Sequence, residues 1–247
     1  MTFWDHLDEL RTVLLRCLTV ATLFAILAFI FKDEVFYVVF APKQQDFLPR
    51  IFGSSPEIQL INTELTKQFV IHMMTSFYVG LIVSAPYIIY QLYHFISPAL
   101  YENEKRYATS IVTSGYLMFF AGVAFSYFIV FPITFRFLGN YQVADDVHNL
   151  ISLESYIDTL MMLSLMMGIV FEIPVIAWLL GRLGIIDSSL MKQYRRHAIV
   201  VIVVIAAIIT PTSDAFTLAI VSLPMYLLFE LSILVVPSHR KRKNINR

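Results

Sequence analysis

Apolar runs alternate with shorter polar stretches along the whole chain of 247 residues. Six of these runs are candidate helices, at about residues 12–31, 69–95, 107–138, 156–183, 198–210 and 215–236. A helix needs about 20 residues to cross the hydrocarbon core of a bilayer, and all runs except the fifth reach that length. The pattern predicts an all-α polytopic membrane protein with six transmembrane helices, in a single integral membrane domain over residues 1–247.

The fifth run is too short to cross a bilayer of ordinary thickness. Its residues, about 13 in number, rise roughly 20 Å as a helix. The turn signal Thr210-Pro211-Thr212-Ser213-Asp214 separates this run from the sixth and contains no basic residue. We expect the last two helices to form a short hairpin whose tip barely leaves the bilayer, with local membrane thinning as one accommodation.

Prolines interrupt four of the apolar runs, at Pro86, Pro132, Pro174 and Pro224. Each proline removes one intrahelical hydrogen bond and tends to kink the helix that contains it. The sequence therefore predicts several kinked helices in a curved bundle. The alternative is that these kinks have no specific meaning, because such bends are common in membrane helices.

Composition agrees with a membrane protein and excludes several kinds of chemistry. Hydrophobic residues make up 58% of the chain and charged residues 15%, against roughly 25% charged in soluble domains. The single cysteine, Cys17, excludes an intramolecular disulfide and a cysteine-built zinc site. No phosphate-binding loop, His-Glu-x-x-His motif or metal-ligand spacing of histidines occurs. We therefore expect no enzyme activity, no cofactor, no metal site and no nucleic-acid partner.

Lysine and arginine placement predicts the orientation in the membrane. If both ends are cytoplasmic, the basic residues on that side are Arg11, Arg16, Lys105, Arg106, Arg182, Lys192, Arg195, Arg196, Arg240, Lys241, Arg242, Lys243 and Arg247. The other side then holds Lys32, Lys43, Arg50, Lys67 and Arg136. Thirteen against five satisfies the positive-inside rule, and the basic tail at 237–247 can lie beside anionic headgroups.

The start of the chain is acid-rich and has no small-x-small cleavage site, so we expect the first helix to stay as an anchor.

The longest predicted outer loop covers about residues 32–68 and includes Pro42. Within it, Phe36-Tyr37-Val38-Val39-Phe40 and Phe47 are apolar enough to lie at the membrane interface. We expect a short amphipathic helix here rather than a free loop.

Two acidic clusters are predicted to lie on the cytoplasmic side. The first is His6-Leu7-Asp8-Glu9-Leu10-Arg11, directly before the first apolar run, and the second is Tyr101-Glu102-Asn103-Glu104-Lys105-Arg106. One interpretation of the first cluster is a plain amphipathic entry helix, with Trp4 at the interface. The other is a binding site for a cationic ligand, for which arginine is the strongest candidate because its planar fork pairs bidentately with a carboxylate.

Glu172 is an acidic residue deep inside the fourth apolar run. A charged carboxylate at such a depth costs about 2.5 to 3.5 kcal/mol on insertion scales. The side chain should therefore be protonated, paired or exposed to a watery cavity. Glu172 is a candidate functional residue, and the alternative is an acid that an internal hydrogen bond neutralises for packing alone.

The motifs resemble those of the TatC family, the multi-spanning core of the twin-arginine protein translocase. After the first acidic cluster, the matches follow in order: Ser84-Ala85-Pro86, Tyr90-Gln91, Phe95-Ile96-Ser97-Pro98-Ala99-Leu100-Tyr101, Glu104, Phe131-Pro132, Phe171-Glu172-Ile173-Pro174, Thr210-Pro211, Asp214, Pro224 and Glu230. The likeness covers nearly the whole chain. It departs from the family pattern after Thr210-Pro211, where a Pro-Asp step and a Thr-Gln pair are expected, and this leaves partner docking near the last two helices open.

The resemblance implies a receptor that binds the twin-arginine signal peptide of folded precursor proteins. TatA- and TatB-type single-span partners then support transport driven by the proton motive force, within a complex that contains several copies of this chain in a bacterial inner membrane. The implied signal-peptide-binding residues are Glu9, Arg11, Phe95 and Glu104. Those implied to shape the structure or partner surface are Leu10, Pro42, Pro86, Gln91, Pro98, Leu100, Pro174 and Asp214, while Glu172 is expected to meet a polar side chain of a partner helix or to disturb the bilayer locally.

Two other classes of function stay open at this point. A proton-coupled small-molecule carrier could also use Glu172, although no pair of matching halves is visible in the six unequal runs. In a structural membrane scaffold the acidic clusters would be incidental.

Overall fold

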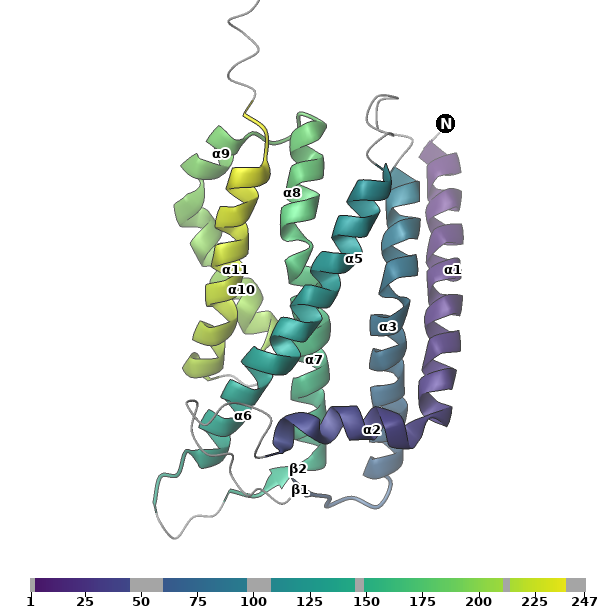
Figure 1. Ribbon diagram of the computed structural model, residues 1–247, viewed down its shortest axis with the longest axis vertical. Coiled ribbons are helices and arrows are strands. Elements are labelled where there is room, and N and C mark those ends of the chain that lie inside the picture. The colour runs from purple at the N-terminus through teal and green to yellow at the C-terminus, as the bar shows by residue number, and fades with distance from the viewer. Residues whose placement is uncertain (1–2, 45–59, 97–107, 145–148, 211–213, 239–247) are drawn as a thin grey trace, which may run out of the picture.

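The computed structural model describes residues 3–44, 60–96, 108–144, 149–210 and 214–238. These residues form a bundle of helices packed side by side (Figure 1). The helices are α1 Phe3–Ile30, α2 Lys32–Phe40, α3 Lys67–Ile96, α5 Ala108–Phe125, α6 Phe131–Asn140, α7 Leu153–Phe171, α8 Ile173–Arg182, α9 Ser188–Gln193, α10 Arg195–Ile209 and α11 Ala215–Val235. A 3₁₀ turn, η1 Ala41–Lys43, a π-helical segment, η4 Ser126–Val130, and two short strands, β1 Leu60–Ile61 and β2 Ile151–Ser152, complete the described elements.

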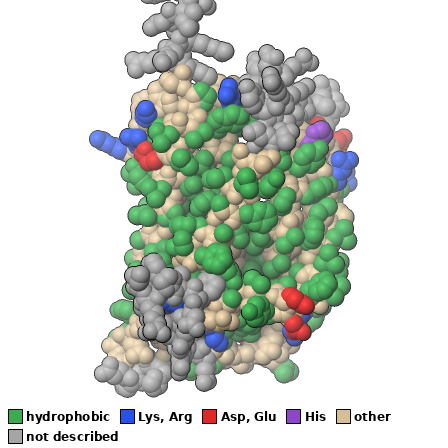
Figure 2. All heavy atoms as spheres, in the orientation of Figure 1, with side chains coloured by type: hydrophobic (Ala, Val, Ile, Leu, Met, Phe, Trp, Pro, Cys, Tyr) green, Lys and Arg blue, Asp and Glu red, His purple; other side chains and the backbone are tan. Residues whose placement is uncertain are grey.

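The prediction of an all-helical membrane protein is confirmed. Among the described residues, five helical stretches are long and apolar enough to cross a membrane: 7–30, 67–95, 111–140, 153–182 and 215–235. Figure 2 shows apolar side chains over the middle of the molecule and charged side chains mainly toward its two ends. The start of α1 and the last turn of α11 lie at the same end, here called the N-terminal end, and α2 lies at the opposite end (Figure 1).

The helix α10 is the short member of the expected hairpin. It has 15 residues, which rise about 22 Å, so it spans less of a bilayer than its neighbours. It packs against α11, and Asp214 begins α11 as its N-cap, where Oδ1 accepts a hydrogen bond of 2.7 Å from the backbone N–H of Thr217. Asp214 thus caps α11, while the turn at 211–213 lies outside the described residues.

The four prolines lie in two kinds of helical surroundings. Pro86 and Pro224 lie inside the continuous helices α3 and α11. Pro132 and Pro174 lie in the first turns of α6 and α8, and each of these helices continues a preceding helical segment, because the backbone at Val130 and Glu172 is itself helical. The third and fourth predicted helices therefore remain helical stretches that change their hydrogen-bond pattern beside a proline, the third in the π-helical segment η4 and the fourth at a turn at Glu172.

The α2 end of the bundle is closed by short elements that link distant parts of the chain. The helix α2 covers the residues expected to form an amphipathic helix, and Pro42 follows it as a buried residue of η1; Phe47 lies outside the described residues. Tyr127 donates a 2.6 Å hydrogen bond to the carbonyl oxygen of Val38, and Tyr156 donates one of 3.0 Å to that of Val39. The carbonyl oxygen of Val38 also accepts the backbone N–H of Ala41, so the bond from Tyr127 is a second one to that oxygen. The two tyrosines thus join the end of α2 to η4 and α7.

The same end is strengthened by two further contacts. The strands β1 and β2 pair in parallel, with Leu60 opposite Ile151. The ammonium group of Lys67 lies 2.7 Å from the carboxylate of Glu154, which joins the start of α3 to the start of α7. The largest buried side chains, among them Tyr156 and Phe131, pack directly inside this end. These contacts join α2, α3 and α7 at the α2 end.

The helices α1 and α3 approach each other closely through small residues. Ala21 is almost fully buried, and a Cβ placed on Gly80 would lie 2.8 Å from the backbone oxygen of Ala21 and 2.6 Å from the backbone nitrogen of Ala25. These neighbours are backbone atoms, so they cannot move aside as a flexible side chain would. In lipid, close packing of small residues is a main source of helix association.

We predict that Gly80→Leu lowers the free energy of unfolding by about 1–3 kcal/mol, because overpacking forces the two backbones apart. Equilibrium unfolding in mixed micelles would measure the change. Val83→Leu is the matched control, because Val83 lies on the same helix and is 44% exposed. Equal stability of the two variants would contradict a close α1–α3 contact.

Candidate functional site

A cavity of about 320 Å³ lies at the N-terminal end, between the first turns of α1 and the last turn of α3. Its walls are formed by Asp8, Glu9, Thr12, Val13, Arg16 and His94. Five of these residues come from α1 and one from α3. The wall thus combines two carboxylates, one guanidinium and one imidazole.

Helical periodicity explains which residues of α1 reach the cavity. Glu9, Val13 and Arg16 repeat at i, i+4 and i+7, so they share one face of the helix. Val13 is buried on this face, and Glu9 is half-buried next to it. Asp8 and Arg16 are exposed, and the hydroxyl of Thr12 donates a 2.9 Å hydrogen bond to the backbone oxygen of Asp8. The burial of Val13 therefore places Glu9 on the face of α1 that lines the cavity.

The structure separates two residues that the sequence grouped together. Arg11 follows Glu9 by two positions, which is about 200° around the helix, and its side chain is exposed outside the cavity wall. Phe95 is half-buried in the last turn of α3 and does not line the cavity, and Leu10 is half-buried on α1. Glu104, Pro98 and Leu100 lie outside the described residues.

Sequence reasoning did not select His94 for this site. Its imidazole is exposed and lies parallel to the ring of Tyr90, with 6.3 Å between the ring centroids and 1° between the planes. The signal available in the sequence was weak: a histidine directly before Phe95, at the end of an apolar run. Gln91, by contrast, is buried in α3, where its Nε2 donates a 2.7 Å hydrogen bond to the hydroxyl of Tyr87.

Glu172 lies at the turn between α7 and α8, followed by the buried Pro174. Its Oε1 atom is buried and has no hydrogen-bond partner among the described residues. A Cβ on Gly115 of α5 would lie 3.3 Å from Oε2 of Glu172 and 3.0 Å from a methyl group of Ile89 on α3. The carboxyl group therefore lies beside Gly115, where α5 has no side chain, and close to Ile89 of α3. The alternative role for Glu172 was an acid that an internal hydrogen bond neutralises for packing alone. Oε1 forms no hydrogen bond with any described residue, so this atom gives no support to that alternative.

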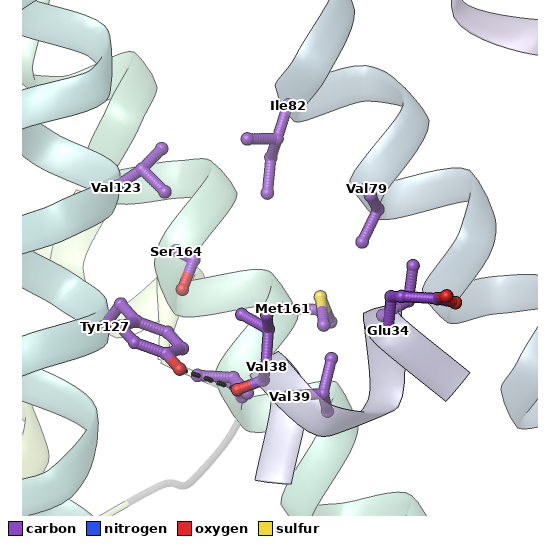
Figure 3. A pocket seen from close by; sticks show the side chains of 11 residues that line it. Glu34, Val38, Val39, Val79, Ile82, Val123, Tyr127, Met161 and Ser164 are labelled. Carbon is purple, nitrogen blue, oxygen red and sulfur yellow. Dashed lines mark hydrogen bonds between the residues drawn. The ribbon is translucent and has the colours of Figure 1, made fainter. Parts of the chain in front are cut away.

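A larger cavity, of about 370 Å³, lies at the α2 end and has mostly apolar walls (Figure 3). Its lining comes from α2, α3, α5, η4 and α7, and it includes Val39, Val79, Val123 and Met161. Figure 3 shows the hydroxyl of Tyr127 directed to the backbone oxygen of Val38, while Glu34 extends away from the cavity. Among the residues described, no three His, Cys, Asp or Glu side chains gather closely enough to hold a metal ion.

A cluster of three polar side chains, Arg195, Tyr226 and Glu230, also joins α10 to α11 at the N-terminal end. Arg195 donates a 2.6 Å hydrogen bond to the carboxylate of Glu230, and the hydroxyl of Tyr226 donates one of 2.9 Å to the other oxygen. Glu230, one of the residues in the family-like motifs, thus holds the short helix α10 to its neighbour.

These features define a class: a polytopic helical membrane protein with a charged cavity at one end and an acidic group inside the bundle. The model of the family "Sec-independent protein translocase protein (TatC)" matches residues 5–224. The chain belongs to the TatC family. It is therefore a component of the twin-arginine, or Sec-independent, protein translocase, and the small-molecule carrier alternative is not favoured.

Curated relatives and solved structures agree with this assignment. The TatC protein of Aquifex aeolicus is 34% identical over 251 residues, covering all of both chains. That of Escherichia coli K12 is 35% identical over 228 residues, which cover 92% of this chain and 85% of the relative. A crystal structure of the twin arginine translocase receptor TatC shares 33% identity, with a TM-score of 0.80 over 93% of this chain and 97% of that one. A second such structure, in the detergent DDM, gives 0.81 over 94% and 99%.

We predict that Arg195 and Glu230 are energetically coupled. In a double-mutant cycle with Arg195→Ala and Glu230→Ala, the coupling should be about 0.2–1 kcal/mol, because both side chains are partly exposed to solvent. Equilibrium unfolding in mixed micelles would measure it. Arg196→Ala, at the adjacent exposed arginine, should show no coupling to Glu230, and coupling of equal size would argue against the specific pair.

Proposed function

We propose that this chain is the translocase subunit that binds the twin-arginine signal peptide of folded precursor proteins. The observation that carries the proposal is the cavity at the N-terminal end, where Glu9 is held half-buried between α1 and α3. Family membership supports it, because the solved relatives are described as the twin arginine translocase receptor. The proposed activity is binding and transport, without an enzymatic reaction.

The chemistry of the cavity suits an arginine side chain. A guanidinium group presents paired N–H donors in a plane, and a carboxylate accepts them bidentately. Glu9 offers such an acceptor beside Asp8, on a helix that runs from the interface into the apolar part of the bundle. We propose that Glu9 and Glu104 face the paired arginines, with Arg11 and Phe95 at the edge of the binding surface and Leu10, Pro98 and Leu100 shaping it.

The proposed orientation places the N-terminal end in the cytoplasm of a bacterium, with the chain in the inner membrane. The excess of basic residues on this side, thirteen against five, supports it. A signal peptide could then place its arginines in the headgroup zone and its apolar stretch in lipid. TatA- and TatB-type single-span proteins, and further copies of this chain, are the proposed partners for transport driven by the proton motive force.

Glu172 is proposed as a contact for a polar side chain of a partner helix. Its buried Oε1 atom has no hydrogen-bond partner among the described residues, so an incoming polar group would satisfy it. The glycine at position 115 leaves space beside the carboxyl group that a larger residue would fill.

We predict that charge removal at either acid weakens signal-peptide binding. Glu9→Gln and Glu104→Gln should each reduce crosslinking of a twin-arginine peptide to the purified protein in membranes, by about tenfold or more, because a charge-assisted hydrogen bond contributes about 1.5–3 kcal/mol. A Lys-Lys peptide should crosslink weakly to the unsubstituted protein.

The matched control for these variants is Glu34→Gln, at an exposed acid of α2 on the opposite end. Crosslinks should map to the first turns of α1 and to residues 95–106. Undiminished crosslinking in both variants and with the Lys-Lys peptide would mean that the signal peptide docks elsewhere.

A separate prediction concerns Glu172. Glu172→Ala should leave peptide binding within about twofold of the unsubstituted protein, since the residue lies outside the cavity, yet reduce transport of a precursor into membrane vesicles at least tenfold. Asp158→Asn, at another acid of α7, is the control and should transport normally. Loss of peptide binding in Glu172→Ala would contradict the separation of the two sites.

A further inference from the structure

His94 is the one wall residue of the described cavity that comes from α3, and neither the sequence motifs nor the proposed function gives it a role. We propose that the His94 ring binds a guanidinium group of the signal peptide opposite the α1 carboxylates, and that this contact favours arginine over lysine in the peptide. The inference rests on the proposed function, since it concerns the same cavity.

The position of His94 suits such a contact. The ring is exposed, lines the same cavity as Asp8 and Glu9, and lies parallel to the ring of Tyr90. Tyr90 is itself 51% exposed, so the pair forms an aromatic surface at the edge of the bundle rather than part of its core. An arginine that enters the cavity therefore meets carboxylates on the α1 side and an aromatic ring on the α3 side.

A guanidinium group can use both walls at once. Its N–H groups point outward in the plane, toward carboxylate oxygens, while its flat faces stack on aromatic rings. An ammonium group has no such plane, so lysine would gain less from the ring. His94 would thus contribute to the choice of arginine over lysine.

The other charged groups of the described wall all come from α1. They are the carboxylates of Asp8 and Glu9 and the guanidinium of Arg16. Among the described wall residues, His94 therefore supplies the only ring on which a guanidinium face can stack.

The experiment measures the affinity of a twin-arginine peptide and of a Lys-Lys peptide for the full-length protein in lipid nanodiscs, at pH 8 and at one ionic strength. The variants are His94→Phe, which keeps an aromatic ring, and His94→Ala, which removes it.

His94→Phe should bind the twin-arginine peptide as the unsubstituted protein does, because a phenylalanine ring also stacks on a guanidinium group. His94→Ala should bind roughly two- to fivefold more weakly at pH 8, the size expected of an exposed cation–π contact. With a Lys-Lys peptide, His94→Ala should change binding less than twofold at pH 8.

His197→Ala is the matched control, because His197 is also an exposed histidine beside a tyrosine, Tyr194, but lies on α10. It should bind the peptide as the unsubstituted protein does. Full affinity of His94→Ala for the twin-arginine peptide, or an equal loss for the Lys-Lys peptide, would overturn the inference. Glu9→Gln separates the two proposals: if it binds the peptide normally, the proposed function fails, and if it alone weakens binding, the receptor stands without a role for His94.

Discussion

The close approach of helix backbones is the constraint on which this bundle depends. In lipid there is no hydrophobic effect to press helices together, so packing of small residues and a few hydrogen bonds must do so. Gly80 lets α3 lie against α1, and a Cβ on Gly122 of α5 would collide with the backbone oxygen of Met167 on α7. The positions of α1 relative to α3, and of α5 relative to α7, follow from these contacts. Both the N-terminal cavity and the space beside Glu172 lie between helices placed in this way.

Glu230, Glu9 and Glu172 differ in the burial and in the partners of their carboxyl groups. Glu230 is held by Arg195 and Tyr226, so its oxygens are satisfied within the chain. Glu9 lies at the end of the bundle, in a cavity that also contains a guanidinium group and an imidazole. Glu172 lies inside the bundle, with one buried oxygen that no described residue satisfies. Burial and partners, rather than residue type, therefore divide these acids into a structural link, a proposed ligand site and a proposed partner contact.

A good part of the candidate site was predictable from sequence, and part was not. Glu9 could be selected because an acidic cluster before an apolar run is a local pattern, and Glu172 because a carboxylate within an apolar run is costly wherever its helix packs. The sequence could not separate Arg11 from Glu9, because which face of α1 is buried depends on α3. His94 was missed for the same reason, since it joins the cavity through the packing of α3 beside α1.

Hydropathy by itself determined the polytopic helical class of the fold, the shortness of the α10–α11 hairpin and the apolar surface, because transfer of each segment into lipid is a property of that segment alone. Order of motifs along the chain was enough to indicate the family. Tertiary structure decided that the helical pattern changes next to Pro132 and Pro174, at η4 and at the turn at Glu172, while Pro86 lies inside a continuous α-helix. It also decided the pairing of Glu230 with Arg195, 35 residues away. Such features depend on the rotation and register of one helix against another, which the pattern within a single helix does not specify.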